Sequence, residues 1–228
     1  MKNMPEEHIK FAMSYSCGKD SALALHRMKE LGHKPVALII TVNEEQCRSW
    51  FHGVDDELMD CISKALDIPL IKSRSKGEDY TEKLEQAMKS AKDMGAEAVV
   101  FGDIDIDDHF KWCSDRCENV GLKAVFPLWG EKRDALVQES IELKYSSYIK
   151  CIRKDVLSTD ILGKRLTKET IDEIINSGVD ACGENGEYHT LVIDGPIFKS
   201  KVDVVLESII EWEKHAAIDI KANVSKEN

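Results

Sequence analysis

The residues best suited to chemistry lie in a short polar stretch near the N-terminus, SYSCGKDS (residues 14–21). An apolar run precedes this stretch and an alanine- and leucine-rich segment follows it, which predicts a strand, a tight turn and a helix. The N–H groups of the helix N-terminus, the hydroxyls of Ser16 and Ser21 and the ammonium of Lys19 would together bind an anion such as phosphate. Asp20 could cap the helix or position a phosphate-bound Mg²⁺ ion.

Two common phosphate-binding patterns do not match this stretch. The pattern Gly-x-x-x-x-Gly-Lys-Ser/Thr needs a glycine where Met13 stands and a hydroxyl residue where Asp20 stands. The pattern Gly-x-Gly-x-x-Gly fails because Gly18 is isolated. A plain strand–turn–helix with Asp20 as the helix cap explains the spacing equally well, so the residues alone leave both interpretations open.

A second motif, VVFGDIDIDDHFKWCSDRC (residues 99–117), begins with a strand-like run. Gly102 permits close approach of the backbone, and Asp103 lies beyond the carboxyl end of the strand, where it could orient a nucleophile or hold a cation. We expect Asp107 and Asp108 to act as helix caps and dipole partners. Trp112 is either a core residue or an aromatic wall for a cationic group.

His109, Cys113 and Cys117 share one helical face in this motif, at positions i, i+4 and i+8. The spacing suits metal ligands, but a fourth ligand is missing, so we expect packed side chains rather than a metal site.

The third motif is CGENGEYHTLVIDGPIF (residues 182–198). Glu184 and Glu187 are separated by a glycine turn and followed by Tyr188 and His189. So many polar groups exceed what a surface connection needs, although a solvated turn before a strand is the simpler alternative.

The elements that must position these motifs alternate in type along the first part of the chain. Apolar runs and helical periodicity predict strands at 9–15, 35–42, 68–72, 98–104 and 123–128, and helices at 20–31, 55–67, 79–94 and 107–119. Alternation of this kind implies a parallel sheet covered on both faces. A polar loop is expected at 43–53.

The regular alternation of predicted strands and helices ends after Gly130. Helices are expected at 134–144 and 168–177, and strands at 146–153 and around 189–193. The tail, 202–224, fits either strands or a helix.

Composition limits the class of protein. The chain has 228 residues and a formal net charge of −11, which argues against broad binding to nucleic acid. Seven cysteines without a framework spacing indicate reduced thiols, and no Cys-x-x-Cys pair is present. The charged N-terminus does not resemble a signal peptide, and no apolar run is long enough to cross a membrane, so we expect a cytoplasmic protein without a membrane partner.

The stretch SCGKDS resembles the Ser-Gly-Gly-Lys-Asp-Ser loop of the N-type ATP pyrophosphatases, the PP-loop proteins of the adenine nucleotide alpha hydrolase superfamily. Cys17 departs from that pattern because glycine is usual there. A Cβ atom is tolerated only if the position does not need a positive φ, or if the loop is distorted. The cysteine is either a tolerated small residue or, beside a lysine and a helix start, an acidified and oxidation-prone thiol.

Together with FPLWG (residues 126–130), the three motifs resemble the diphthine–ammonia ligase family, from about Lys10 to Phe198. The resemblance implies an α/β fold: a Rossmann-like parallel five-stranded sheet of the HUP type and a smaller C-terminal α+β domain. It also implies a PP-loop ATP-binding domain and an acceptor-recognition domain. The change in the pattern of elements near Gly130 places these domains at residues 1–130 and 131–228.

The family's chemistry implies ATP and Mg²⁺ as cofactors. A carboxylate of diphthine, on elongation factor 2, is adenylated and then amidated by ammonium, which releases AMP and pyrophosphate. No glutaminase domain is visible, so free ammonium is expected. Elongation factor 2 is the expected protein partner in an archaeon or eukaryote, with another carboxylate in a bacterium and a homo-oligomer left open.

The resemblance assigns roles to individual residues. The expected catalytic residues are Lys19, Asp20 and Asp103, with Asp20 also at the Mg²⁺ ion. The expected ATP-binding residues are Ser14, Ser16, Cys17, Gly18, Lys19, Ser21, Val42 and Gly102. The expected acceptor-binding residues are Trp112, Glu184, Asn185, Glu187, Tyr188 and His189, with the two glutamates attracting the quaternary ammonium of diphthine beside an aromatic ring.

Two alternatives compete with this interpretation. One is a PP-loop ATPase that modifies tRNA or another small carboxylate, against which the acidic charge counts. The other is a nucleotide-binding regulatory protein without catalysis, for which Cys17 is the only hint.

Overall fold

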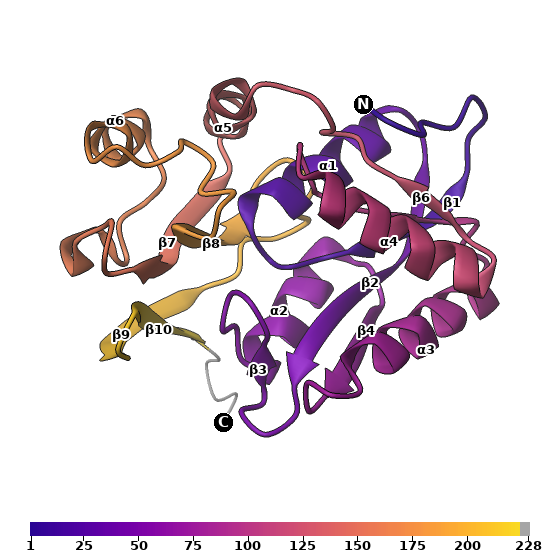
Figure 1. Cartoon of the computed structure of the whole chain (residues 1–228), viewed down its shortest axis with the longest axis horizontal. Coiled ribbons are helices and arrows are strands. Elements are labelled where there is room, and N and C mark those ends of the chain that lie inside the picture. The colour runs from indigo at the N-terminus through magenta and orange to yellow at the C-terminus, as the bar shows by residue number, and fades with distance from the viewer. Residues whose placement is uncertain (224–228) are drawn as a thin grey trace. The chain divides into compact units, whose positions relative to one another are not determined.

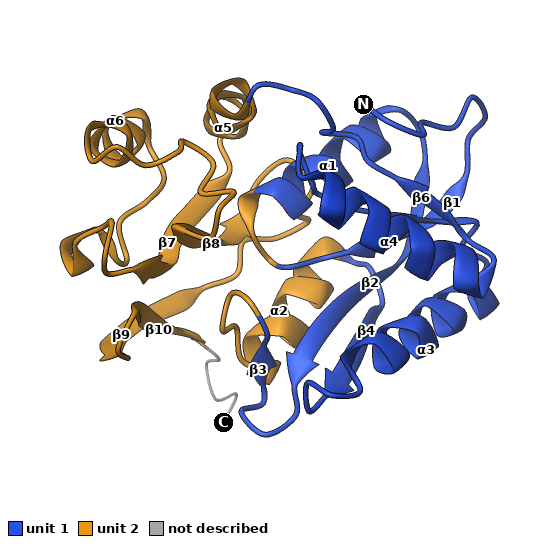
Figure 2. Cartoon of the chain, in the orientation of Figure 1, with its two compact units in different colours: residues 1–16, 20–50, 67–132 blue, residues 17–19, 51–66, 133–228 orange. Residues whose placement is uncertain are grey.

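The chain folds into two compact units, seen in a computed structural model that describes residues 1–223 (Figure 1). Unit 1 comprises residues 1–16, 20–50 and 67–132, and unit 2 comprises residues 17–19, 51–66 and 133–228 (Figure 2). The domain boundary after residue 130 stays a prediction. No helix in the described part of the chain is long and apolar enough to cross a membrane.

Unit 1 is built on a parallel sheet. Its elements are β1 (Lys10–Ser14), α1 (Lys19–Glu30), β2 (Lys34–Asn43), β3 (Arg48–Ser49), β4 (Leu70–Ser75), α3 (Tyr80–Asp93), β5 (Ala98–Val100), α4 (Asp107–Val120) and β6 (Lys123–Val125). The parallel strands lie in the order β4-β2-β1-β5-β6, and the short β3 pairs antiparallel with the end of β2. The predicted five-stranded parallel sheet is therefore confirmed.

The strand order reverses beside β1. The chain first moves outward from β1 to β2 and β4, then returns to β5 on the other side of β1 and continues to β6. Sheets of this type bind ligands beyond the carboxyl ends of the strands at such a reversal. Two of the three motifs, SYSCGKDS and VVFGDI, leave the sheet at the carboxyl ends of β1 and β5.

Apolar side chains hold these strands in place. Phe11, Ala12 and Met13 of β1 are completely buried, as expected for a central strand with both faces covered. Helices α3 and α4 cover one face: Met88 of α3 and Cys117 of α4 belong to one apolar cluster with residues of the sheet. Helix α4 ends at Gly121, whose φ of +68° provides the left-handed cap.

Unit 2 carries an antiparallel sheet. Its elements are α2 (Asp56–Leu66), α5 (Arg133–Glu142), β7 (Ser146–Arg153), a 3₁₀ turn (Thr159–Ile161), α6 (Lys168–Asn176), β8 (Tyr188–Asp194), β9 (Val204–Glu211) and β10 (His215–Ala222). The strand order is β8-β7-β10-β9. Helix α2 is tied to this sheet by an ion pair of 2.7 Å between Lys221 of β10 and Asp55.

The structure settles the expectations for individual elements. The helices start and end within two residues of the predicted bounds. The predicted loop at 43–53 contains the two-residue strand β3, and β5 and β6 are shorter than predicted. The ambiguous tail forms the β9–β10 hairpin because β10 pairs with β7 and buries Ala216 and Ile220. Residue 224, the end of the predicted tail, lies outside the described residues.

Candidate functional site

The turn after β1 is braced by hydroxyl groups. The backbone N–H of Tyr15 donates to the Ile39 carbonyl (2.8 Å), which extends the pairing of β1 with β2 just past Ser14. The backbone N–H of Ser16 donates to the Ser21 hydroxyl (3.3 Å), and the two hydroxyl oxygens lie 3.2 Å apart. The two serines therefore hold the turn against the start of α1. Asp20 lies inside the first turn of α1 rather than before it.

Cys17 occupies a strained position in this turn. Its φ is +66°, in the left-handed region where a Cβ atom costs about 1–2 kcal/mol. The position therefore does need the positive φ that the family glycine supplies. The thiol is completely buried, and burial raises the pKa of Cys17 far above its usual value. Burial therefore argues against the alternative of an acidified thiol and favours the tolerated small residue.

Lys19 is buried and held at both ends, within unit 2. Its side chain is only 4% exposed, and its ammonium donates to the Cys182 carbonyl (2.5 Å). Its backbone N–H donates to the hydroxyl of Thr190 on β8 (3.0 Å). The ammonium also lies 5.4 Å from the centre of the Tyr188 ring. The third motif thus positions the lysine of the first motif.

The loop that carries the third motif is a packed structure rather than a solvated turn. The carboxylate of Asp180 accepts hydrogen bonds from the backbone N–H groups of Cys182 (3.0 Å) and Glu184 (2.9 Å), and it pairs with Arg133 (2.7 Å). Gly183 has a φ of +67°, and a Cβ atom there would lie 2.6 Å from the Tyr188 ring. The Tyr188 hydroxyl donates to the carbonyl of Ala181.

The two glutamates of this motif have different environments. Glu187 is 8% exposed, and both its carboxylate oxygens accept hydrogen bonds from Asn185, one from the backbone N–H and one from the side-chain amide (3.0 Å each). Glu187 therefore shapes the loop. Glu184 is half-buried and Asn185 is exposed.

A pair of histidines lies beside the same strand. The rings of His52 and His189 have centres 4.7 Å apart, and Nδ1 of His52 is 2.7 Å from the carbonyl oxygen of Thr190. Burial and the charge of Lys19 lower the pKa of His189 to about 4, and burial also lowers the pKa of His52. Both rings are therefore neutral at neutral pH. The sequence analysis missed His52 because it lies far from the motif along the chain.

Gly102 provides a close contact within unit 1. A Cβ atom at this position would lie 2.9 Å from the backbone nitrogen of Ser21 and 3.0 Å from the carbonyl carbon of Asp20. The loop after β5 therefore packs directly against the first turn of α1, as the glycine predicted. Asp103 follows it, half-buried, with a carboxylate oxygen 3.3 Å from Nδ1 of His109.

An aromatic row lies near the ends of β2 and β4. The ring centres of Trp50 and Tyr80 are 6.1 Å apart, and those of Tyr80 and Trp112 are also 6.1 Å apart. The indole N–H of Trp50 donates to the hydroxyl of Ser75 (2.9 Å), and Trp112 stacks with Arg116 at 5.7 Å. Only Trp112 was predicted, because Trp50 and Tyr80 lie in segments that the sequence analysis assigned to a loop and a helix.

Three other expectations concern α4 and β2. Cys113 and Cys117 are buried in the apolar cluster, and the described residues contain no group of three ligands that could hold a metal ion. Burial raises the pKa of Cys117 to about 12. Asp107 and Asp108 lie in the first turn of α4, not at its cap, which is Ile106. The side chain of Val42 is completely buried.

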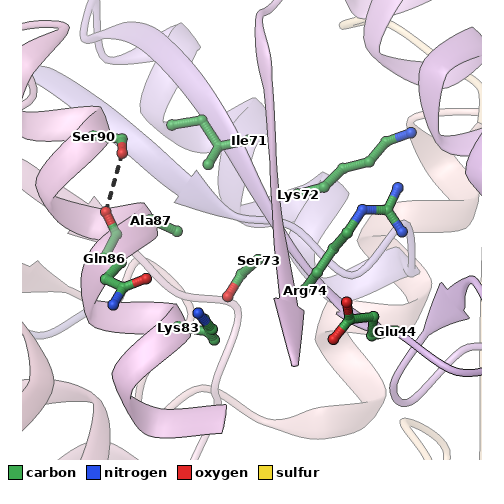
Figure 3. Close-up of a pocket in the computed structure, with 9 residues that line it drawn as sticks. All are labelled: Glu44, Ile71, Lys72, Ser73, Arg74, Lys83, Gln86, Ala87 and Ser90. Carbon is green, nitrogen blue, oxygen red and sulfur yellow. Dashed lines mark hydrogen bonds between the residues drawn. The ribbon is translucent and has the colours of Figure 1, made fainter. Parts of the chain in front are cut away.

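A cavity of about 360 Å³ lies elsewhere in unit 1, along the outer edge of β4 (Figure 3). Lys72 and Arg74 of β4 and Lys83 of α3 contribute cations to it. None of the predicted site residues lines this cavity.

Both halves of the chain match known sequence families. The family described as Diphthamide synthase N-terminal domain matches residues 9–124, and the family described as Diphthamide synthase C-terminal domain matches residues 132–225.

Curated relatives extend the match over most of the chain. A protein named Diphthine--ammonia ligase from Danio rerio is 28% identical over 211 residues, which cover 82% of this chain and 83% of the relative. The protein of that name from Homo sapiens is 26% identical over 227 residues, covering 89% and 85%. The Schizosaccharomyces pombe protein of that name is 26% identical, but the match spans only 36% of its length. With both halves matched and the two loops built around one lysine, this chain belongs to the diphthamide synthase family.

Proposed function

We propose that this chain is an ATP-dependent diphthine–ammonia ligase that adenylates a protein-borne carboxylate and amidates it with free ammonium. The observation that carries the proposal is the place of the SCGKDS turn. It leaves β1 where the order of the parallel strands reverses, and its lysine is held by the Cys182–His189 loop. Matches to both family halves and to ligases of this name support it.

The phosphates of ATP would bind at the turn. The acceptor carboxylate attacks the α-phosphorus, and the bond to the pyrophosphate breaks, so negative charge grows on the leaving group. Lys19 and the N-terminus of α1 stabilise that charge, with the hydroxyls of Ser16 and Ser21 as hydrogen-bond donors. Ammonium first loses a proton to solvent, and the resulting ammonia attacks the acyl carbon. AMP leaves, and the nitrogen gives up a second proton to solvent to form the amide.

The residues around this turn fit a Mg²⁺ ion. Asp20 and Asp103 are hard oxygen ligands, and the close contact of Gly102 with Asp20 brings the loop that carries Asp103 to the start of α1. A bound Mg²⁺ ion would neutralise phosphate charge there. Asp20 remains the proposed ligand, and Asp103 is proposed to orient the reacting groups.

The adenine ring would lie near the ends of β1 and β2. Because the Val42 side chain is buried, only the main chain of this residue could contact the adenine ring. Trp50 and Tyr80 would supply the aromatic surface against which the ring packs.

We propose the Cys182–His189 loop of unit 2 for recognition of the acceptor, and the predicted role of Trp112, which lies in unit 1, stays a prediction. Both carboxylate oxygens of Glu187 accept hydrogen bonds from Asn185. We therefore propose that Glu184 attracts the quaternary ammonium group and that Glu187 stabilises the conformation of the loop. The Glu184→Gln variant should raise the KM for the acceptor with little change in kcat. The Glu187→Gln variant should instead lower kcat, because a loosened loop no longer positions Lys19. Equal KM values in wild-type protein and both variants would remove the proposed role of Glu184.

The direct test uses elongation factor 2 that carries diphthine, with ATP, Mg²⁺ and ammonium. We expect AMP, pyrophosphate and the mass change that replaces a carboxylate by an amide. AMP formation without amidation would retain the adenylation chemistry and assign another carboxylate as acceptor. Binding of ATP without AMP formation, in wild-type protein and in the Cys17→Gly variant, would favour the regulatory alternative.

A further inference from the structure

The edge strand β9 exposes an unusual concentration of apolar side chains. Exposed large apolar residues cluster in and just after this strand: Val205 (45%), Leu206 (41%), Ile209 (45%), Ile210 (37%) and Trp212 (54%). They occur on both faces of a strand that, within residues 1–223, pairs only with β10. A long, apolar, unpaired edge is a template for pairing with another chain.

The other sheet edges in the described residues are covered or charged. The edge of β8 is covered by residues 17–19: the carbonyl of Cys17 accepts from Val192 (2.8 Å), and Lys19 donates to Thr190. Beyond β6, Lys2 and Phe126 exchange two backbone hydrogen bonds (3.0 and 3.1 Å). Strand β4 carries two cationic side chains, Lys72 and Arg74, which Figure 3 shows. Charges on an edge strand oppose pairing. Strand β9 carries two exposed glutamates, Glu207 and Glu211, but most of its other exposed side chains are apolar.

A bulge in β9 determines which side chains share a face. Ile218 pairs with Ile209 and Ile220 pairs with Leu206, so the single residue between them on β10 faces two residues on β9. Leu206 and Ile209 therefore lie on the same face of the sheet, which strict alternation would forbid. Val205 and Ile210, the partners of Lys221 and Ala217, lie on the other face.

This geometry makes β9 self-complementary. A twofold axis perpendicular to the sheet reverses the strand direction and keeps every side chain on its own face. With the axis at the bulge, Leu206 faces Ile209 of a second strand, and Val205 faces Ile210. Each pairing joins apolar side chains on one face, which stabilises antiparallel strands.

The charges agree with the same register. Glu207 then faces Ser208 of the second strand and Glu211 faces Val204, so no carboxylate faces another. A shift of two residues would place Glu211 opposite Leu206 and Glu207 opposite Ile210. We propose that β9 pairs antiparallel with β9 of a second copy of this chain, joining the two unit 2 sheets into one continuous sheet.

The size of this contact sets the expected affinity. An interface of standard size uses about 20–30 residues on each side, and a single strand provides far fewer. The dimer is therefore concentration-dependent, with a dissociation constant in roughly the micromolar range. This inference does not depend on the proposed catalytic function.

The test is sedimentation equilibrium of the full chain over a range of concentrations. We expect a monomer–dimer equilibrium, and we expect Ile209→Lys to raise the dissociation constant at least tenfold. The matched control is Ile175→Lys on α6, an isoleucine with nearly the same exposure (47% against 45%), which should leave the constant unchanged. A wild-type monomer at every concentration, or a dimer unaffected by Ile209→Lys, overturns the proposal.

A cross-linking experiment tests the register. In a Cys47→Ser background, which removes an exposed thiol, the Leu206→Cys protein is mixed with the Ile209→Cys protein. Directly opposed residues of antiparallel strands lie within disulfide reach, so the mixture should form a linked dimer and neither variant alone should. If each variant alone formed as much disulfide-linked dimer as the mixture, this register would be contradicted. Hydrogen exchange of the β9 backbone amides provides a further check. If these amides became protected only when the protein substrate was added, β9 would bind that substrate rather than a second copy of this chain, which would overturn the proposal.

Discussion

The two units bury different kinds of polar side chain. Among residues 1–223, the buried lysines and carboxylates all belong to unit 2, and they are Lys19, Lys150, Glu187 and Asp219. The buried polar residues of unit 1 are serines and histidines: Ser21, His26, His33, Ser49, Ser73 and Ser75.

This difference shows two ways of building a site. Buried charge is costly unless it is hydrogen-bonded, and unit 2 meets that requirement with main-chain carbonyls for both lysines and with Asn185 for Glu187. Unit 1 contributes backbone geometry instead, with Gly102 packed against the first turn of α1. Substitutions of the buried charged residues of unit 2 should therefore act through charge, and substitution of Gly102 in unit 1 should act through steric contact.

The largest effect is expected at Lys19. The Lys19→Met variant keeps the length of the side chain but removes the charge that stabilises the leaving pyrophosphate. We expect kcat for AMP formation to fall by about 10²–10³-fold, the loss typical of removing one such donor. Single-turnover kinetics with saturating ATP measures this loss. A variant with wild-type kcat would show that the buried charge serves the fold alone.

The second prediction concerns the pH dependence of stability. The pKa of His189 is lowered from 6.5 to about 4 in the folded state. Between these values the unfolded state binds more protons, so the free energy of unfolding falls as the pH drops from 6.5 towards 4. The loss should approach roughly 3 kcal/mol, and His52 acts in the same direction. Urea unfolding across this window measures it, and His189→Gln should flatten the profile.

Lys150 sharpens the comparison because it is as deeply buried as Lys19 (1% against 4%) and also donates to a main-chain carbonyl, that of Ile218 (2.5 Å). It lies where β10 diverges from β7, so we assign it a structural role. Lys150→Met should lower the free energy of unfolding by about 1–3 kcal/mol, because the Ile218 carbonyl loses its partner. Its kcat should match the wild-type value, and a loss like that of Lys19→Met would contradict this division.

In unit 1, Gly102→Ala should act by steric contact. The added methyl group meets backbone atoms of Ser21 and Asp20, and relieving such a contact costs about 1–3 kcal/mol. The unfolding temperature and kcat should both fall. The size of each fall should be the same at every pH in the range in which His189 titrates. The control is Gly130→Ala, which has no neighbour within 4 Å and only a positive φ to strain. If the effect of Gly102→Ala varied with pH, the distinction between the units would fail.

The smallest effect is expected at Cys17. Cys17→Gly relieves the strain of the positive φ. It also removes buried side-chain packing and gives the unfolded chain more conformational freedom. Because these effects oppose one another, the free energy of unfolding should stay within about 1 kcal/mol of wild type. Cys17→Val, which is β-branched at the same φ, should be clearly less stable. In native protein a thiol reagent should modify the exposed Cys47 well before Cys17. Rapid reaction of Cys17 would mean that the turn opens.

Much of the fold was predictable because its signals are local. The apolar run of β2, the glycine that ends α4 and the periodicity of α2 each identify an element from a few neighbouring residues. Strand β3 has no such signal, since its two residues form a strand only by pairing with the end of β2. The tail was ambiguous for the same reason, because pairing with β7 decides that β10 is a strand.

The candidate site was predictable only in its motifs. The three polar stretches were recognisable because their density of glycines, hydroxyls and charges exceeds what turns require. The contacts of Lys19 with Cys182 and Thr190 were not, and neither were His52, Trp50 and Tyr80. The role of Glu187 also changed, since a carboxylate in a turn looks the same in sequence whether it faces solvent or closes its own loop.

The sequence by itself determined the alternation of strands and helices, the family and the residue types at the turn, because these depend on near neighbours and on motif spacing. Only the tertiary structure decided that Cys17 has a positive φ and that the ammonium of Lys19 donates a hydrogen bond to the distant Cys182–His189 loop. It also decided that β9 is an exposed, largely apolar edge strand. The physical reason is that burial and hydrogen bonding between distant segments follow from packing, which no local pattern encodes.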